Sequence, residues 1–282
     1  MYRAAGQRAY TSGLRQVARG DCKAGAASLA RVIGYFHYVP GLPVEKARAS
    51  IAECPIISAA DAAAHRGDLR GALSGFRDFV AQHPRSVLEP YARRRWGEVG
   101  SQWGAKLISL GSFKTAIETF EELSSAFPGT PLAAEARRDA ADAYLDLAAA
   151  KEGNTASAFH WQEAVDAYRT VVEQYADTDA ASAAGASIER LYRKAVDGLK
   201  PGHGCDPLDI LRALTRDELH VQDGVPLLAL AQYRCVVWEV GHGYSILAVD
   251  EITDFLTTYP DDPHVPDARR LLKKAREEAS AG

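Results

Sequence analysis

Residues 111–128 read GSFKTAIETFEELSSAFP, and this motif decides the fold because the chain contains it three times. The other copies are GDLRGALSGFRDFVAQHP at 67–84 and GYSILAVDEITDFLTTYP at 243–260. The copies begin 44 and then 132 residues apart, and 132 is three times 44. Self-similarity at such a period is typical of stacked repeat proteins, in which each unit contacts its neighbours. The motif therefore points to an extended binding surface rather than to a catalytic pocket.

Each copy carries the pattern of one amphipathic helix. Counted from the opening glycine, small or apolar residues fall at offsets 5, 6, 9, 12 and 16, close to the spacing of a helical stripe. The opening glycine ends the preceding helix, and the closing proline stops this one. We therefore expect each copy to be the first helix, helix A, of a helical hairpin. Helix B is expected at about 86–110, 130–150 and 263–279.

Weaker versions of the pattern fill the rest of the chain, so the sequence predicts an all-α solenoid of about six helix-turn-helix repeats. Pro55 is expected to kink or restart a helix, and the β-like run 235–238 is expected to be helical because of the repeat register. The expected parts are a leading helix at 1–20 and repeats near 21–66, 67–110, 111–158, 159–201, 202–242 and 243–282.

Composition excludes some classes of function. The chain has 282 residues, is 47% apolar and 25% charged, and carries a formal net charge of −4, so we expect no nucleic-acid partner. No stretch approaches the roughly 20 apolar residues that span a bilayer, and the first residues are too polar for a signal peptide. Two interpretations stay open. The chain is cytoplasmic, or it is an excised mature or soluble segment with an added Met1. A membrane anchor outside this chain is compatible with the second interpretation.

The recurring pattern resembles the tetratricopeptide repeat, and within it a bacterial envelope subset. That subset includes the lipoprotein of the barrel-assembly machinery and the coordinator of the Tol–Pal system. Its helix A ends in an aromatic residue or histidine before proline, and small residues open helix B. The resemblance implies a right-handed superhelix whose concave face, lined by A helices, binds a peptide or a partner domain. It rests on Phe76, Phe79, His83, Pro84 and Ala92; on Phe120, Leu123, Phe127, Pro128 and Ala136; and on Ile252, Phe255, Tyr259, Pro260 and Ala268.

Four cysteines occupy similar places in two of the weaker repeats. Cys22 and Cys54 are 32 residues apart, and Cys205 and Cys235 are 30 apart. Each pair puts one cysteine at the start of helix A and one in the following helix B, which lie side by side in an antiparallel hairpin. The spacing fits better for the second pair. We expect two disulfides, with buried free thiols as one alternative and a metal site as another.

The metal alternative would use His203, Cys205, Cys235 and His242, which are zinc-ligand types at no familiar spacing. We otherwise expect no metal and no cofactor. The sequence contains no phosphate-binding loop, nucleophile elbow or His-Glu-x-x-His motif, so it predicts no catalytic residues and no enzyme. If the disulfides form, the compartment is oxidising.

The candidate partner-binding residues lie on the polar side of the A helices, opposite the apolar stripe. The alternative is that they form an ordinary solvated surface. The function that we expect is a non-catalytic scaffold for a protein or peptide partner, in the extracytoplasmic part of an envelope or membrane-anchored protein. The alternative is a cytoplasmic adaptor or sensor domain of a signalling or defence system. The candidate residues are Arg77, Lys114, Glu118, Asp166 and Arg169.

Overall fold

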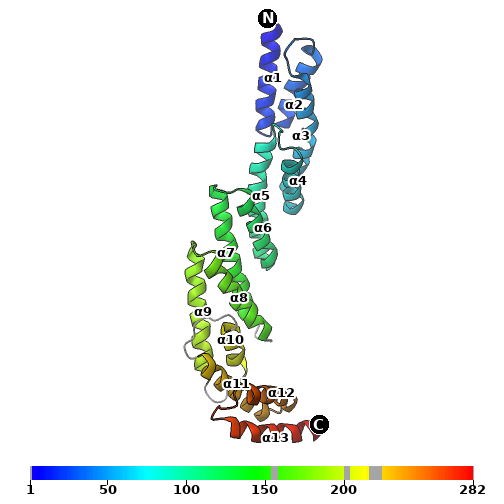
Figure 1. The fold of residues 1–282 in the computed structure, drawn as a ribbon. Helices are drawn as coiled ribbons and strands as arrows, with labels where there is room; N and C mark the ends of the chain where they lie inside the picture. Colours follow the sequence, from blue (N-terminus) through cyan, green and yellow to red (C-terminus); the bar gives the residue numbers. More distant parts are fainter. Residues whose placement is uncertain (1, 154–157, 200–203, 216–223, 282) are drawn as a thin grey trace. The chain divides into compact units, whose positions relative to one another are not determined.

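A computed structural model describes residues 2–153, 158–199, 204–215 and 224–281 (Figure 1). Within these ranges the chain forms helices and no strand, which confirms the all-α fold class. It divides into two compact units, which we call unit 1 (Met1–Ala140) and unit 2 (Ala141–Gly282). The helices are α1 Tyr2–Ala18, α2 Cys22–Tyr35, α3 Val44–His65, α4 Leu69–Gln82, α5 Glu89–Ser109, α6 Phe113–Ala126, α7 Pro131–Glu152, α8 Ala158–Gln174, α9 Asp179–Gly198, α10 Asp206–Thr215, α11 Gly224–Gly241, α12 Ser245–Thr258 and α13 Val265–Ala281.

The three copies of the motif form α4, α6 and α12, and all three end in the same way. The residue before the closing proline is the C-cap, and its backbone N–H donates to the carbonyl four residues earlier. Its backbone leaves the helical region because the proline that follows disfavours it. The three C-caps are His83 (φ −124°), Phe127 (φ −123°) and Tyr259 (φ −125°).

The opening glycines lie at the ends of the preceding helices, in the left-handed region that favours glycine. Their φ values are 79° at Gly67, 71° at Gly111 and 80° at Gly243. After Gly67 the carboxylate of Asp68 caps α4 by accepting a hydrogen bond from the backbone N–H of Gly71 at 2.9 Å. These local signals fix where each A helix begins, as the motif predicts.

The apolar stripe of each A helix forms the core. In unit 1, Ala72, Phe76, Ala116 and Phe120 are at most 1% exposed, and in unit 2 Ala248 and Ile252 are fully buried at the matching positions in α12. Each of these A helices packs against a helix next to it in the sequence, as α4 does against α3 and α5 and α6 does against α5. The repeat motif therefore supplies the residues that hold neighbouring helices together.

The bounds of α3 and α11 decide two local expectations, one on Pro55 and one on the run 235–238. Pro55 lies inside α3, which continues from Val44 to His65, so it does not restart a helix. Its missing N–H removes one hydrogen bond in a helix of 22 residues that packs against α2 and α4. The β-like run 235–238 lies within α11, as the repeat register predicts. Among the described helices, none is long and apolar enough to cross a bilayer.

Candidate functional site

The exposed polar face of α4 and α6 carries three of the predicted partner-binding residues, Arg77, Lys114 and Glu118. The guanidinium of Arg77 reaches across to α6, where its Nη1 lies 3.4 Å from Oε1 of Glu122. Its Nε lies 3.5 Å from Asp78 on its own helix. We call this exposed face of α4 and α6 the A-helix surface. It presents both signs of charge on two helices joined by one exposed ion pair.

The other two predicted residues lie on α8 in unit 2, and one of them is buried. Asp166 is exposed and accepts a hydrogen bond from Nε2 of Gln162 at 2.6 Å. Arg169 is only 8% exposed, which corrects the prediction that it faces solvent. Its Nη2 donates to the carbonyls of Ala213 at 3.2 Å and Leu214 at 2.7 Å, at the end of α10. Arg169 therefore stabilises the terminal carbonyls of a neighbouring helix, which have no partners within that helix.

Both expected cysteine pairs are disulfides in the structure. Cys22 on α2 is bonded to Cys54 on α3, with their Cα atoms 5.5 Å apart. Cys205, just before α10, is bonded to Cys235 on α11, with their Cα atoms 4.6 Å apart. Each bond ties helix A of one hairpin to its helix B, so the two hairpins with the weakest repeat pattern are the ones that are cross-linked.

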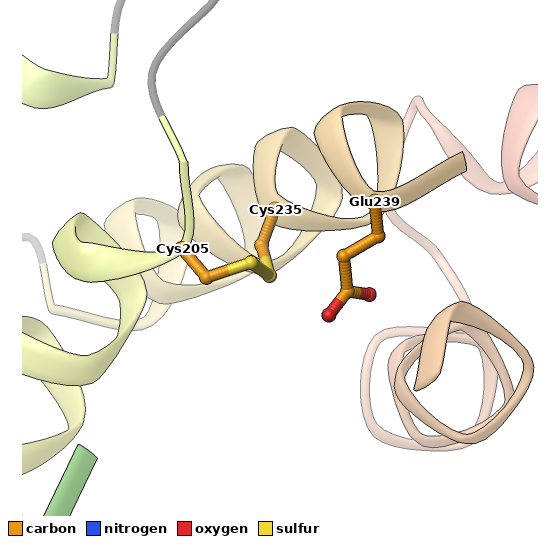
Figure 2. Close-up of side chains that lie close together, drawn as sticks. All are labelled: Cys205, Cys235 and Glu239. Carbon is orange, nitrogen blue, oxygen red and sulfur yellow. A yellow bond between two sulfur atoms is a disulfide. The ribbon is translucent and has the colours of Figure 1, made fainter. Parts of the chain in front are cut away.

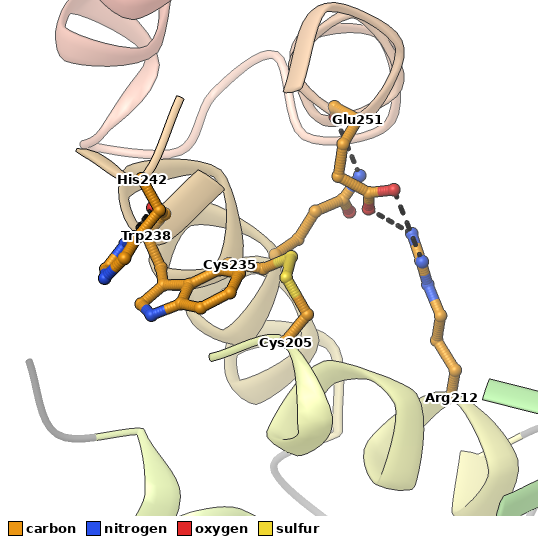
Figure 3. Close-up of a disulfide and its surroundings, with 7 residues drawn as sticks. Cys205, Arg212, Cys235, Trp238, His242 and Glu251 are labelled. Atoms are coloured by element: carbon orange, nitrogen blue, oxygen red, sulfur yellow. Dashed lines mark hydrogen bonds and ion pairs between the residues drawn. A yellow bond between two sulfur atoms is a disulfide. The ribbon is translucent and has the colours of Figure 1, made fainter. Parts of the chain in front are cut away.

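The proposed zinc set is not assembled in the disulfide form. The sulfurs of Cys205 and Cys235 are bonded to each other and are not thiolates, the form in which cysteine binds zinc. The imidazole of His242 stacks on Trp238 at 4.4 Å, and its Nδ1 lies 2.8 Å from the carbonyl of Trp238 (Figure 3). His203 lies outside the described residues. This disulfide has a different neighbour of interest, which is Glu239.

The carboxylate of Glu239 faces the second disulfide. One of its oxygens and the two sulfurs lie within 4.8 Å of one another, and Figure 2 shows the carboxylate and the disulfide on the same side of α11. Glu239 is only 9% exposed, and its Oε2 has no hydrogen-bond partner among the described residues. A buried carboxylate oxygen without a hydrogen-bond partner costs free energy of folding. The burial of Glu239 is therefore not explained by packing alone.

The charges around Glu239 are mostly negative. Burial, and after it the negative charges of Glu251 and Asp209, raise the pKa of Glu239 to about 7, while Arg212 acts in the opposite direction. Burial likewise raises the pKa of Asp209 to about 6. Arg212 is itself paired with Glu251, with 2.5 Å between Nη2 and Oε1 (Figure 3). Its charge is therefore shared, and Glu239 holds a proton at a pH where carboxyl groups are normally ionised.

The sequence contained a signal for this carboxylate that periodicity alone did not single out. Glu239 follows Cys235 by four residues, and residues four apart lie on the same face of a helix. A disulfide at Cys235 therefore implies that Glu239 faces it. No sequence pattern indicates that Asp209 and Glu251 join the cluster, because they come from two other helices.

A second feature that the motif did not predict is an exposed apolar pair at the start of α12. Ile246 is 72% exposed and Leu247 is 61% exposed. The same motif positions carry Arg70 and Gly71 in α4, and Lys114 and Thr115 in α6. A groove of about 510 Å³ lies beside this pair. Its lining is Val240, Gly241, Gly243, Ser245, Ile246, Lys274, Glu278 and Ala279.

A comparison with protein families places part of this chain within a known family. The family described as "YfiO: Outer membrane lipoprotein" matches residues 4–197, which is more than half of the chain. The matched part contains the Cys22–Cys54 disulfide and the A-helix surface. The Cys205–Cys235 disulfide and Glu239 lie beyond its end. No curated protein matches the chain.

Proposed function

The chain belongs to the YfiO family of outer membrane lipoproteins, and from this premise we propose that it is a non-catalytic scaffold of the bacterial envelope that binds a protein or peptide partner through its A helices. The division into a leading helix and six repeats is part of this proposal. The observation that carries it is that the family match covers the helices that present the A-helix surface.

The charged side chains of the A-helix surface can exchange their ion pairs for ion pairs with a partner protein. Arg77 and Glu122 are 44% and 39% exposed, and an ion pair as exposed as this contributes less than about 1 kcal/mol. A carboxylate of a partner can therefore replace Glu122 beside Arg77 at small cost. Lys114 and Glu118 extend the same face along α6. A partner with both acidic and basic side chains fits this pattern.

An extracytoplasmic location agrees with the two disulfides. Disulfides form and persist in oxidising compartments such as the periplasm, and they are rare in the cytoplasm. The family description, which names an outer membrane lipoprotein, supports the same compartment. We therefore place this chain on the periplasmic side of the envelope or at the cell surface.

The proposal is tested by photo-cross-linking in the native envelope. A photoreactive amino acid is placed at Lys114 or Glu118 on the A-helix surface. A matched probe is placed at Arg94 or Arg138, which are exposed on the B helices α5 and α7. We expect the A-helix probes to give one defined adduct that the B-helix probes do not give.

Alanine variants then test the energetics with matched charges. The A-helix set is Arg77→Ala, Lys114→Ala and Glu118→Ala, and the control set with the same charges is Arg94→Ala, Arg138→Ala and Glu98→Ala. We expect the A-helix set to weaken binding of the cross-linked partner by at least about tenfold, which corresponds to 1.4 kcal/mol. Equal adducts from both helix faces, or equal losses from both sets, would contradict the proposal.

A further inference from the structure

The two sulfurs of the second disulfide differ in access. Cys235 is 3% exposed and lies within α11, whereas Cys205 is only partly buried and precedes α10. A Cβ placed on its neighbour Gly204 would lie 3.7 Å from the indole of Trp238. In thiol–disulfide exchange, the rate depends on which sulfur is accessible and on how readily the other sulfur leaves. Cys205 is the more exposed of the two residues, so attack is expected at its sulfur, and the leaving sulfur is then that of Cys235.

A thiolate released at Cys235 would be unstable where it forms. The site is buried, and Asp209 of α10 and Glu251 of α12 place negative charge near it. Among the described residues, the cation that acts on Glu239 is Arg212, which is paired with Glu251. Burial and negative charge both disfavour a thiolate, so the released sulfur requires a proton.

We propose that the Cys205–Cys235 disulfide is a redox-exchange site for an incoming dithiol, and that Glu239 donates the proton that the Cys235 sulfur needs when the bond breaks. Its carboxyl lies within 4.8 Å of both sulfurs. One bridging water, or a small rotation of its side chain after the bond opens, spans that distance. This activity goes beyond the proposed scaffold and does not depend on it.

The step balances as follows. A thiolate of the incoming dithiol attacks the Cys205 sulfur and forms a mixed disulfide, and the electron pair of the broken bond goes to the Cys235 sulfur. Glu239 gives its proton to that sulfur and becomes a carboxylate. The second thiolate of the dithiol then attacks the dithiol's other sulfur, which is bonded to Cys205 in the mixed disulfide. This releases Cys205 as a thiolate. The disulfide gains two electrons, and the dithiol is oxidised to a disulfide.

The first disulfide lacks these features and serves as an internal control. Cys22 and Cys54 are 8% and 5% exposed, so neither sulfur is open to attack. The carboxylate next to it in sequence, Glu53, is already used. Its Oε2 accepts a hydrogen bond from Ser86 at 2.5 Å, and its Oε1 lies 3.5 Å from Nδ1 of His83.

The test measures how fast each disulfide opens in the full chain. The chain is exposed to dithiothreitol between pH 5.5 and 8.5, quenched with acid and alkylated, and each cysteine is followed by peptide mass spectrometry. Rates are divided by the concentration of dithiothreitol thiolate. We expect Cys205–Cys235 to open at least about tenfold faster than Cys22–Cys54. We also expect its normalised rate to fall as pH rises through about 7, the pKa of Glu239.

Glu239→Gln separates a proton donor from a repelling charge. Glutamine has the same shape but neither the proton nor the charge. A proton donor predicts that the variant is slow at every pH, about tenfold below the parent chain at pH 6 and equal to it at pH 8.5. If the variant is instead as fast as the parent at pH 6, the carboxylate acts only through its charge and the proposal is wrong.

Two further results would also overturn the proposal. One is equal opening rates for the two disulfides in the parent chain. The other is the same effect from Glu53→Gln, the matched variant beside Cys54. The opening rate of Cys22–Cys54 and the circular dichroism spectrum, both unchanged in Glu239→Gln, show that the variant is folded.

Discussion

Unit 1 and unit 2 are built from the same helical motif, but they bury different polar groups. Among the described residues, the buried polar side chains of unit 1 are Ser50 and Thr119. Each donates its hydroxyl proton to the carbonyl four residues earlier in its own helix. Unit 2 buries Arg169, Gln232, Glu239 and Ser245. Arg169, Gln232 and Ser245 make hydrogen bonds to other helices, so the polar interior of unit 2 depends on how its helices are assembled.

One motif position makes this difference clear. Arg77 in α4 and Arg169 in α8 occupy the same offset, ten residues after the start of their repeats. Arg77 is exposed on α4, whereas Arg169 binds the terminal carbonyls of α10. A shared motif position therefore determines the face of the helix but not what covers that face. Arg169 becomes buried because α10, which lies beyond the family match, packs against α8 within unit 2.

Removing the disulfides has the largest expected effect and tests whether the two units differ. The loops that they close are of nearly equal length, 32 and 30 residues, so loss of either should lower the free energy of unfolding by about 3–4 kcal/mol. Cys205→Ser with Cys235→Ser should cost about 1 kcal/mol less than Cys22→Ser with Cys54→Ser. The reason is that the hydroxyl of a serine at 235 can donate to the unpartnered Oε2 of Glu239.

Hydrogen exchange followed by mass spectrometry reports the loss in each unit separately. Each double variant should increase exchange mainly in the unit that carries it. A cost in unit 2 that equals or exceeds the cost in unit 1 would mean that the buried carboxylate gains nothing from a new donor. The stability lost with each disulfide would then depend only on the length of the loop that it closes.

The two arginines at the shared motif position give the next largest effect. Arg169→Met keeps the length of the side chain but removes two charge-assisted hydrogen bonds to α10, so we expect unit 2 to lose about 2–3 kcal/mol. Arg77→Met removes only exposed ion pairs, with Glu122 and with Asp78, so we expect a change within about 0.5 kcal/mol. Chemical denaturation of both variants measures the difference. Equal effects would show that the burial of Arg169 has no energetic consequence.

The fold was predictable because its signals are local. A glycine at positive φ, a capping carboxylate such as Asp68 and a proline after the C-cap each act within a few residues. The stripe of small and aromatic residues then fixes which face is buried. Pro55 shows where such reasoning fails, because packing on both sides of α3 keeps the helix continuous through a residue that normally interrupts one.

The site was less predictable because it depends on contacts between helices. The cysteine pairs could be inferred because a hairpin brings its two ends together. The burial of Arg169 could not, since it requires knowing that α10 ends against α8. Glu239 lay between these cases. Its spacing from Cys235 was visible, but its unusual pKa also depends on Asp209 and Glu251, which belong to α10 and α12.

Replacing Glu239 gives the smallest of these stability effects and the most specific one, because its size depends on pH. Burial raises its pKa in the folded chain to about 7, above the ordinary value of 4.5. Between these pH values the folded state binds more protons than the unfolded state, so unit 2 loses stability as pH rises from about 4.5 through about 7. Asp209, whose pKa is raised to about 6, adds to the loss in the same direction.

Glu239→Gln should therefore stabilise unit 2 at pH 8 and leave it nearly unchanged at pH 4.5. We expect a gain of about 1–2 kcal/mol at pH 8, once residual solvent screening is allowed for. Urea unfolding at a series of pH values measures this gain. The free energy of unfolding of the variant should depend less steeply on pH than that of the parent chain, but the dependence should not vanish because Asp209 still titrates. Glu53→Gln in unit 1 should leave the pH dependence of unit 2 as it is. A variant whose stability ran parallel to that of the parent at every pH would show that the Glu239 carboxyl ionises as freely as an exposed one. The buried carboxyl of unit 2 would then contribute no pH dependence to its stability, and the two units would not differ in this respect.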